Sequence, residues 1–234
     1  MIAVLGAAHA FPPVAQALRE PDGLLAAGGD LSPGRLLAAY RSAVFPWFSP
    51  GDPILWWSPS QRMVLVPGQV RITRSLAKAI RNHRYRITID TAFEQVMRAC
   101  AAPRDGQNGT WITDEMVAAY AELHRLGHAH SYEFWQDDRL AGGLYGVAVG
   151  RMFYGESMFH RATDASKITF VTMAQHLQRH GFGMVDCQMF TPHLESLGAQ
   201  LISRDEFIAR LETSLGQPQP AGMWQESFRN EPSR

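Results

Sequence analysis

Hydrophobic periodicity separates the chain into two parts near residue 62. From Gln61 onward, apolar residues recur either at every second position, as in strands, or at every third and fourth position, as in helices. Before that point the chain is rich in Gly, Pro and Trp and has little regular period. We therefore predict a small N-terminal domain over residues 1–62 and a larger domain over residues 63–234.

The larger part alternates predicted strands with predicted helices. The strands are expected at 62–66, 85–89, 129–135, 139–147, 152–158 and 184–190, and the helices at 73–82, 91–100, 114–126, 165–179, 192–197 and 203–215. A meander followed by helix, strand and helix is an α+β pattern with a mixed, largely antiparallel sheet. This order is compatible with a GNAT-type (N-acetyltransferase-like) acyltransferase domain. The Pro- and Gln-rich tail after Gly216 is expected to be loosely held.

Local signals set several of these boundaries. Thr91 and Ser203 each begin a capping-box pattern, in which a hydroxyl at the N-cap is followed three residues later by Glu. Thr113 is expected to cap a helix that stops at Gly127. Residues 44–61 contain four prolines and three tryptophans. Proline at this density predicts a rigid, turn-rich platform without a central helix or strand.

Composition limits the class of protein. With 234 residues, of which 46% are hydrophobic and 19% charged, the chain can bury a sizeable core. Lys+Arg and Asp+Glu both number 22, so any basic patch that binds nucleic acid must be local. The two cysteines, Cys100 and Cys187, suit a reducing compartment. No apolar run approaches the ~20 residues that span a bilayer, so we expect a cytoplasmic protein with no membrane partner.

The most unusual carboxylate lies in the predicted hairpin 142–159. Glu156 stands alone among apolar residues, and strand alternation would place it on one face with Met152, Tyr154 and Met158. Burying a carboxylate without a partner is costly. Glu156 therefore needs either a structural partner or a functional role.

A second polar pair lies in the predicted strand 184–190. Asp186 and Gln188 are two residues apart, which would put both side chains on one face about 7 Å apart. A carboxylate beside an amide can accept a proton or orient an attacking amine. In the alternative interpretation, Asp186 pairs within the core and Gln188 bonds to the backbone. A second carboxylate on an apolar strand favours function, because a fold rarely buries two without a reason.

Two features could contact RNA. Arg74, Lys78 and Arg81 fall on one helix face, and no Asp or Glu occurs between residues 71 and 89. Such a run is either a solvated face or a phosphate-backbone contact, which would also include Arg84. The tryptophans, which include Trp47 and Trp111, are either small-domain core or a platform for nucleobases.

Several common sites are absent from the sequence. It contains no P-loop, Rossmann glycine fingerprint, G-x-S-x-G elbow or zinc-finger spacing. His124, His128 and His130 are close in sequence, but no Cys or carboxylate is in register with them. We therefore assign these histidines to the surface and predict no metal site. The segment GAAHAF (6–11) is not a phosphate loop.

Several long segments resemble the leucyl/phenylalanyl-tRNA–protein transferases. They are REPDGLLAAGGDLSPGRLLAAY (19–40), FPWFSPGDPILWWSP (45–59), GTWIT (109–113), LHRLGHAHS (123–131), GGLYGVAVGRMFYGESMF (142–159), ASK (165–167), and DCQ with HLESLGA (186–199). The resemblance implies a bacterial, cytoplasmic aminoacyltransferase with a small N-terminal domain and an acyltransferase-like domain. Such an enzyme moves Leu or Phe, and less readily Met, from tRNA to the α-amine of proteins beginning with Arg or Lys. The product is marked for N-end-rule degradation.

The resemblance also implies roles for individual residues. Asp186 and Gln188 match a pair that activates the incoming amine, and Glu156 matches a carboxylate of the same site. The residues implied in binding the aminoacyl group and the terminal adenosine are Leu144, Phe153, Gly155, Ser157, Met158, Phe170, Trp47 and Trp111. Leu144 and Phe170 depart from the family's pattern, which has methionine and a smaller aliphatic residue there.

The implied chemistry needs no cofactor, because the donor is already activated as an ester. We expect neither ATP nor metal, and a monomeric enzyme. A CoA-dependent N-acyltransferase is the second hypothesis, but the Q/R-x-x-G-x-G/A turn that binds pyrophosphate is missing after residue 159. A non-catalytic RNA-binding module is the third, and it leaves Glu156, Asp186 and Gln188 unexplained.

Overall fold

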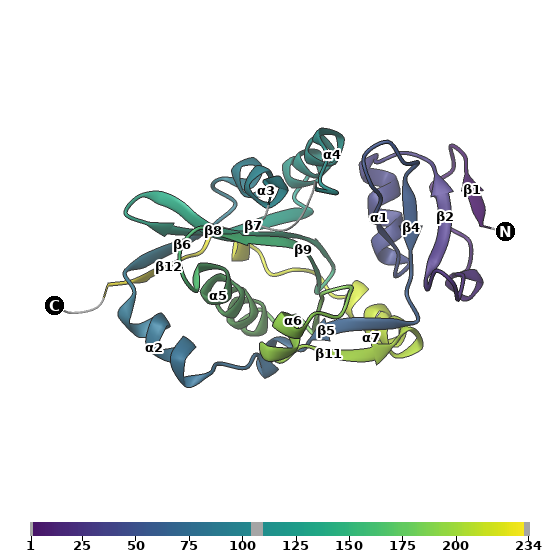
Figure 1. The fold of residues 1–234 in the computed structure, drawn as a ribbon. Coiled ribbons are helices and arrows are strands. Elements are labelled where there is room, and N and C mark those ends of the chain that lie inside the picture. The colour runs from purple at the N-terminus through teal and green to yellow at the C-terminus, as the bar shows by residue number, and fades with distance from the viewer. Residues whose placement is uncertain (1, 104–109, 232–234) are drawn as a thin grey trace.

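The computed structural model describes residues 2–103 and 110–231, so the expected loop 103–109 lies almost wholly outside the described residues. Two sheets organise the chain (Figure 1). A four-stranded sheet, in the order β1-β2-β4-β3, forms one end of the molecule, and an eight-stranded sheet, in the order β11-β5-β10-β9-β8-β7-β6-β12, forms the body. The first sheet ends at Trp57 and the second begins at Gln61.

The small sheet is built from short strands that have no hydrophobic period of their own. They are β1 (Ala3–Leu5), β2 (Leu24–Gly28), β3 (Phe45–Pro46) and β4 (Leu55–Trp57), accompanied by η1 (Val14–Gln16) and α1 (Pro33–Arg41). The expectation of no central strand in 44–61 is wrong, because β4 lies between β2 and β3. Proline is tolerated here because β4 contains none and Pro46 lies in the edge strand β3.

The large sheet contains the predicted meander. Its strands are β5 (Gln61–Leu65), β6 (Tyr85–Ile89), β7 (Ala129–Gln136), β8 (Arg139–Val149), β9 (Met152–His160), β10 (Met184–Asp186), β11 (Gln200–Ser203) and β12 (Ser227–Asn230). Every pairing is antiparallel except that of β9 with β10, which is parallel. The α+β prediction with a mixed, largely antiparallel sheet is confirmed.

Helices cover both faces of the large sheet. They are α2 (Arg74–Asn82), α3 (Phe93–Ala101), α4 (Asp114–Arg125), α5 (Ala165–Arg179), α6 (Pro192–Ser196) and α7 (Arg204–Leu215), with the short η2 (Pro67–Gln69) and η3 (Met223–Gln225). Figure 1 shows α3 and α4 on one face and α5 on the other. Among the described residues, no helix combines the length and apolar character needed to cross a membrane.

Two of the three predicted helix caps form. Thr113 and Ser203 accept hydrogen bonds from the backbone N–H groups of Met116 and Glu206. The prediction for Thr91 is wrong, because its hydroxyl donates to the buried Glu133 carboxylate at 3.0 Å, and the helix begins after Ala92. A buried carboxylate needs several hydrogen-bond donors, so the Thr91 hydroxyl binds Glu133 and does not cap α3.

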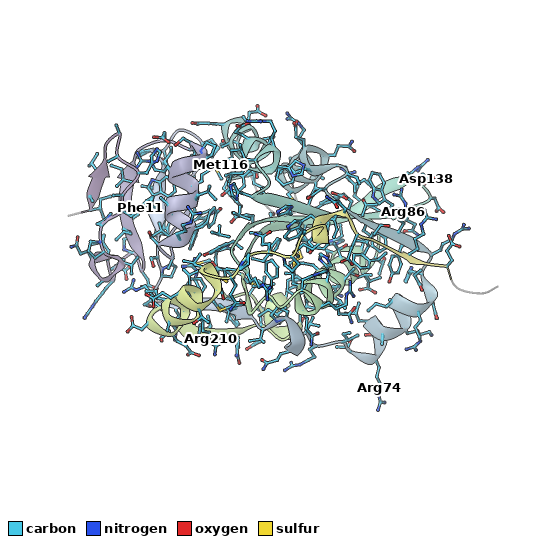
Figure 2. All side chains as sticks on the ribbon, turned by 180° about the vertical axis from the view of Figure 1, so that it is seen from behind. Phe11, Arg74, Arg86, Met116, Asp138 and Arg210 are labelled. Carbon is cyan, nitrogen blue, oxygen red and sulfur yellow. The ribbon has the colours of Figure 1, made fainter. Side chains whose placement is uncertain are left out.

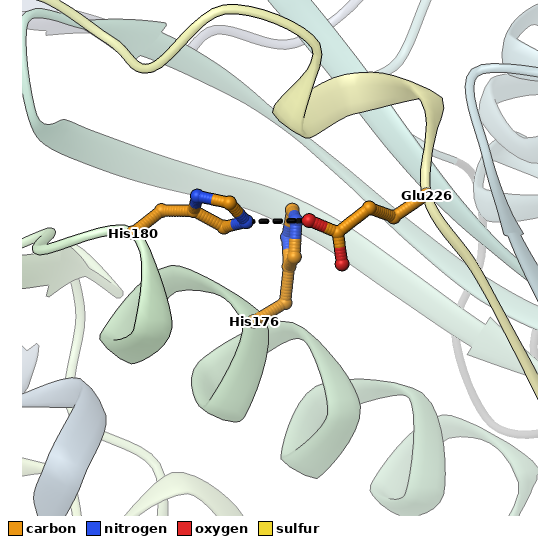
Figure 3. A group of neighbouring side chains, drawn as sticks. All are labelled: His176, His180 and Glu226. Atoms are coloured by element: carbon orange, nitrogen blue, oxygen red, sulfur yellow. Dashed lines mark hydrogen bonds and ion pairs between the residues drawn. The ribbon is translucent and has the colours of Figure 1, made fainter.

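The C-terminal tail is fastened rather than loose, so that expectation is wrong. Strand β12 pairs with β6, and Met223 is buried. Figure 3 shows how His176 of α5 and His180, the residue that follows this helix, meet Glu226 of the tail. His180 Nε2 lies 2.6 Å from Glu226 Oε1, and His176 bonds to Tyr132 through Nδ1 and to the Met223 carbonyl through Nε2. These bonds tie the tail to α5.

Candidate functional site

The site begins where two parallel strands separate. Strand β10 pairs with β9 from Met184 opposite Met152 to Asp186 opposite Tyr154, and then it ends, while β9 continues to His160. The predicted strand 184–190 is therefore too long. Gln188 has a φ of +54°, which turns the chain away from the sheet. The separation opens a space between β9 and the segment that follows β10.

Two connected hollows occupy this space. One is an open cleft of about 950 Å³ between the N-terminal part and the large sheet, and the other is an apolar pocket of about 100 Å³ beneath it. The residues that line both are Glu156, Ser157, Met158, Cys187, Gln188 and Leu194. The cleft and the pocket therefore meet at the polar groups of Glu156 and Gln188.

Most of the predicted binding residues lie around these hollows. Trp47 and Trp111 line the cleft, and the pocket is lined by Leu144, Gly155, Ser157, Met158 and Phe170. Phe153 is the exception, because it is fully buried in the core below, edge-on to Tyr132.

A β-bulge sets the direction of Glu156. Tyr145 is opposite Ser157 and Gly146 is opposite Gly155, so Glu156 is the extra residue of β9. The bulge reverses the alternation: Met152 and Tyr154 pack in one core, whereas Met158 packs against the other. Glu156 therefore shares a face with Met152 and Tyr154 but not, as predicted, with Met158.

Two tyrosines hold the Glu156 carboxylate. Tyr40 of α1 donates to Oε1 at 2.8 Å. The Tyr120 hydroxyl of α4 contacts both the Tyr40 hydroxyl and, at 3.4 Å, Oε2, and its single proton serves one of these acceptors at a time. Although Glu156 is partly exposed to the cleft, burial removes much of its hydration and raises its pKa from 4.5 to about 7. The Tyr40 bond opposes this pKa rise, and the charge of Asp186 adds to it.

Asp186 does not face the cleft. It is fully buried, and its two oxygens accept hydrogen bonds from Arg62 Nε at 3.0 Å and Nη2 at 2.7 Å. Arg62 is itself buried between the rings of Phe45 and Phe207 and donates to the Ala43 carbonyl at 2.9 Å. The expected common face of Asp186 and Gln188 is wrong, because the strand ends at Asp186.

Gln188 nevertheless depends on Asp186. Its backbone N–H donates to Asp186 Oδ1 at 2.8 Å, and its carbonyl accepts from the Met63 N–H at 3.1 Å. These bonds fix the backbone at a left-handed conformation. The buried side-chain nitrogen Nε2 has no hydrogen-bond partner among the described residues. An amide donor is thus held unpaired where the cleft meets the pocket.

Sequence reasoning missed three residues of this arrangement. Arg62 falls in the predicted strand 62–66, where a lone charge among apolar residues is the same signal that singles out Glu156. Tyr40 and Tyr120 lie in ordinary amphipathic helices, and nothing in the sequence distinguishes them.

Cys187 also lines both hollows. Burial raises the pKa of its thiol, which keeps the thiol protonated and unsuited to act as a nucleophile.

The predicted RNA-contacting residues lie elsewhere. Arg74, Lys78, Arg81 and Arg84 are all exposed and make no ion pair among the described residues. Figure 2 shows Arg74 extending from the end of the molecule that is distant from Phe11.

His130, expected at the surface, is instead buried and lies 2.7 Å from Asp90 Oδ2.

Comparisons with known proteins match one family over nearly the whole chain. Residues 64–212 match the family model described as leucyl/phenylalanyl-tRNA protein transferase, and residues 29–60 match that of its N-terminal domain. A leucyl/phenylalanyl-tRNA–protein transferase of Chromobacterium violaceum is 61% identical over all of both chains. One of Thiobacillus denitrificans is 59% identical over 92% of this chain and 94% of its own.

Among solved structures, FemX matches 73% of this chain and 66% of its own at 11% identity, with a TM-score of 0.47. The identities and coverage of the sequence relatives decide the family. The chain belongs to the leucyl/phenylalanyl-tRNA–protein transferase family and is a transferase.

Proposed function

We propose that this enzyme transfers Leu or Phe, and also Met, from aminoacyl-tRNA to the α-amine of proteins that begin with Arg or Lys. The observation that carries the proposal is the junction of an apolar pocket with an open cleft at Gln188 and Glu156. The pocket takes the aminoacyl side chain, and the tryptophans of the cleft stack on the terminal adenosine. The modified proteins enter N-end-rule degradation in the cytoplasm.

The lining of the pocket supports an unbranched or γ-branched apolar side chain. Leu144, Met158 and Phe170 provide a flexible apolar surface. One methylene changes binding by only about 1–3 kcal/mol, so a single pocket accepts Leu, Phe and Met. Side chains branched at Cβ, as in Ile and Val, are excluded by shape beside the β9 backbone at Gly155. Leu144 and Phe170 set the ratio of Leu to Phe.

The transfer step exchanges one bond for another. The acceptor amine forms a bond to the ester carbonyl carbon, and the bond from that carbon to the ribose oxygen breaks. Gln188 Nε2 donates to the carbonyl oxygen as negative charge develops there. Glu156, whose pKa is raised to about 7, accepts the proton that the amine loses and returns it to the ribose oxygen.

Asp186 acts through Gln188 rather than on the substrate. With both oxygens bound by Arg62 and one also bound by the Gln188 N–H, it has no route to the amine. We therefore assign the Asp186–Arg62 pair to positioning Gln188. No metal, nucleotide or covalent enzyme intermediate is needed, because the donor ester supplies the driving force.

The remaining features fit a tRNA donor. The parallel β9–β10 pair, which separates at the site, supports a GNAT-type topology for residues 63–234, with residues 1–62 as a separate small domain that contributes Tyr40 and Trp47. Arg74, Lys78, Arg81 and Arg84 contact the tRNA backbone away from the acceptor end. One chain supplies every group named in the mechanism, so a monomer is sufficient.

The test uses radiolabelled donors and a peptide with an N-terminal Arg. Label transferred from Leu-tRNA but not from acetyl-CoA is the expected result. A peptide with N-terminal Ala is the matched acceptor control. Transfer from acetyl-CoA would support the CoA-dependent alternative, and tRNA binding without transfer would support an RNA-binding module.

A further inference from the structure

Three of the elements that line the apolar pocket carry a basic residue within three positions of a lining residue. Met158 of β9 is followed two residues later by His160, Phe170 of α5 is preceded by Lys167, and Leu194 of α6 is preceded by His193. The cluster of His160, Lys167 and His193 is named the basic rim below. None of these three residues is used in the mechanism above.

Spacing along each element directs the three side chains towards one another. Residues two apart on a strand share a face, so His160 continues the Met158 side of β9 outward. Residues three apart on a helix also share a face, so Lys167 lies one turn before Phe170 on the pocket side of α5. His193 itself lines the cleft. Burial lowers the pKa of His193, and the nearby charges of Lys167 and then His160 lower it further, which shows that the three are electrostatic neighbours.

The basic rim has little acidic compensation. Lys167 Nζ lies 3.0 Å from Asp164 Oδ1, and its side chain is still 43% exposed. Arg161, the next basic residue, is directed elsewhere, because its guanidinium lies over the Phe159 ring and donates to the Leu140 carbonyl. One ammonium and one imidazole beside His193, which lines the cleft, suit an anion with several acceptor oxygens.

We propose that the basic rim binds the phosphate group on the 5′ side of the donor's terminal adenosine. This inference rests on the proposed function, because it places the aminoacyl group in the pocket and the adenine against the tryptophans. The phosphate then lies at the edge of the cleft beside His193, where the basic rim lies. Lys167 supplies the charge, and His193 and His160 donate hydrogen bonds. Such a contact fixes the register of the donor without reading its sequence.

Two small donors that differ by one phosphate test the assignment. They are leucyl-adenosine and the same ester bearing a 5′-phosphate, each supplied with the peptide bearing N-terminal Arg. For the wild-type enzyme, the phosphate should lower the donor KM about tenfold, the value of one charge-assisted contact. Lys167→Met should abolish this difference while leaving the KM for unphosphorylated leucyl-adenosine unchanged.

Controls separate the basic rim from general charge and from folding. Arg125→Met removes a cation from an exposed i,i+3 ion pair on α4 and should keep the full phosphate effect. Lys167→Arg should retain most of the phosphate effect, and His193→Gln should lose part of it.

An equal KM for the two donors with the wild-type enzyme, or an undiminished phosphate effect in Lys167→Met, would overturn the inference. A change confined to the peptide KM would overturn it too, by assigning Lys167 to the acceptor. Absence of transfer from either donor would instead contradict the proposed function.

Discussion

Arg62 encloses the carboxylate of Asp186 with two hydrogen bonds, although the residues lie 124 positions apart in the chain. Both side chains are buried, and Asp186 in turn holds the backbone N–H of Gln188. The buried pair therefore connects strand β5 to the turn that presents Gln188. Asp186 therefore supports Gln188 and does not act on the substrate directly.

Asp186→Asn should destabilise the enzyme strongly. Removing one partner leaves the Arg62 guanidinium buried without a counter-charge, which costs about 3–5 kcal/mol in the free energy of unfolding. Urea denaturation measures this loss. Asp114→Asn, which breaks an exposed ion pair with Arg98, is the control and should have little effect. A loss as small as that of the control would show that the pair is not buried as described.

Replacing both partners distinguishes positioning from stability. Arg62→Met with Asp186→Leu removes both charges and should recover much of the lost stability. Transfer should remain slow, because no acceptor then holds the Gln188 N–H. The tRNA dissociation constant should change little. Recovery of the wild-type transfer rate in the double variant would exclude the positioning role.

Transfer should titrate with Glu156. Because its pKa is raised to about 7 and the ionised form accepts the proton, kcat should rise with pH and level off above that value. Glu156→Gln should lower kcat and remove this titration, leaving only the ionisation of the acceptor amine. The raised pKa also makes stability depend on pH. Between pH 4.5 and about 7 the native state keeps the Glu156 proton that the unfolded chain has lost, so the contribution of Glu156 to stability is lost as pH rises through that window. In Glu156→Gln this part of the pH dependence of unfolding should vanish.

Tyr40→Phe should move the midpoint of that titration. The Tyr40 hydroxyl donates to Glu156 and so stabilises the carboxylate, which lowers its pKa. Losing the bond should shift the kcat midpoint to higher pH, because the protonated form is then favoured. Tyr85→Phe removes a hydroxyl far from the cleft and should leave the midpoint in place. A downward shift in Tyr40→Phe would contradict the described hydrogen bond.

The tail should loosen in mild acid. Burial lowers the pKa of His176 from 6.5 to about 4, so the native state resists a proton that the unfolded chain accepts. Stability should therefore fall as pH decreases from about 6.5 towards 4. His176→Gln should flatten this slope in urea denaturation. A slope equal to that of the wild type would assign the acid sensitivity to other groups.

The long periodic elements could be predicted from the sequence, because their signals are local. Helix α5 and strand β6 have the predicted bounds, since Gly181 and the hydrophobic alternation of 85–89 mark them clearly. The features that form the site are not local. The bulge at Glu156 depends on the opposing strand, where a Cβ on Gly146 would lie 2.2 Å from the Tyr154 carbonyl.

Long-range partners explain the remaining differences. Strand β10 ends at Asp186 because Arg62 and the Gln188 turn bind there, and no pattern within 184–190 indicates this. Thr91 leaves its expected cap because Glu133, from a different strand, needs its hydroxyl. The tail forms β12 because β6 offers a free edge. In each case a contact with a residue distant in sequence overrides the structure that the local pattern predicts.

Single-turnover transfer from Leu-tRNA by the wild type and by Gln188→Ala tests the central claim most directly. With enzyme in excess and a peptide bearing N-terminal Arg, the wild type should move the label. The variant should be about 100-fold slower with an unchanged tRNA dissociation constant, because it lacks the donor to the developing oxyanion. Equal rates for the two proteins would contradict the account, and so would a loss explained entirely by weaker tRNA binding.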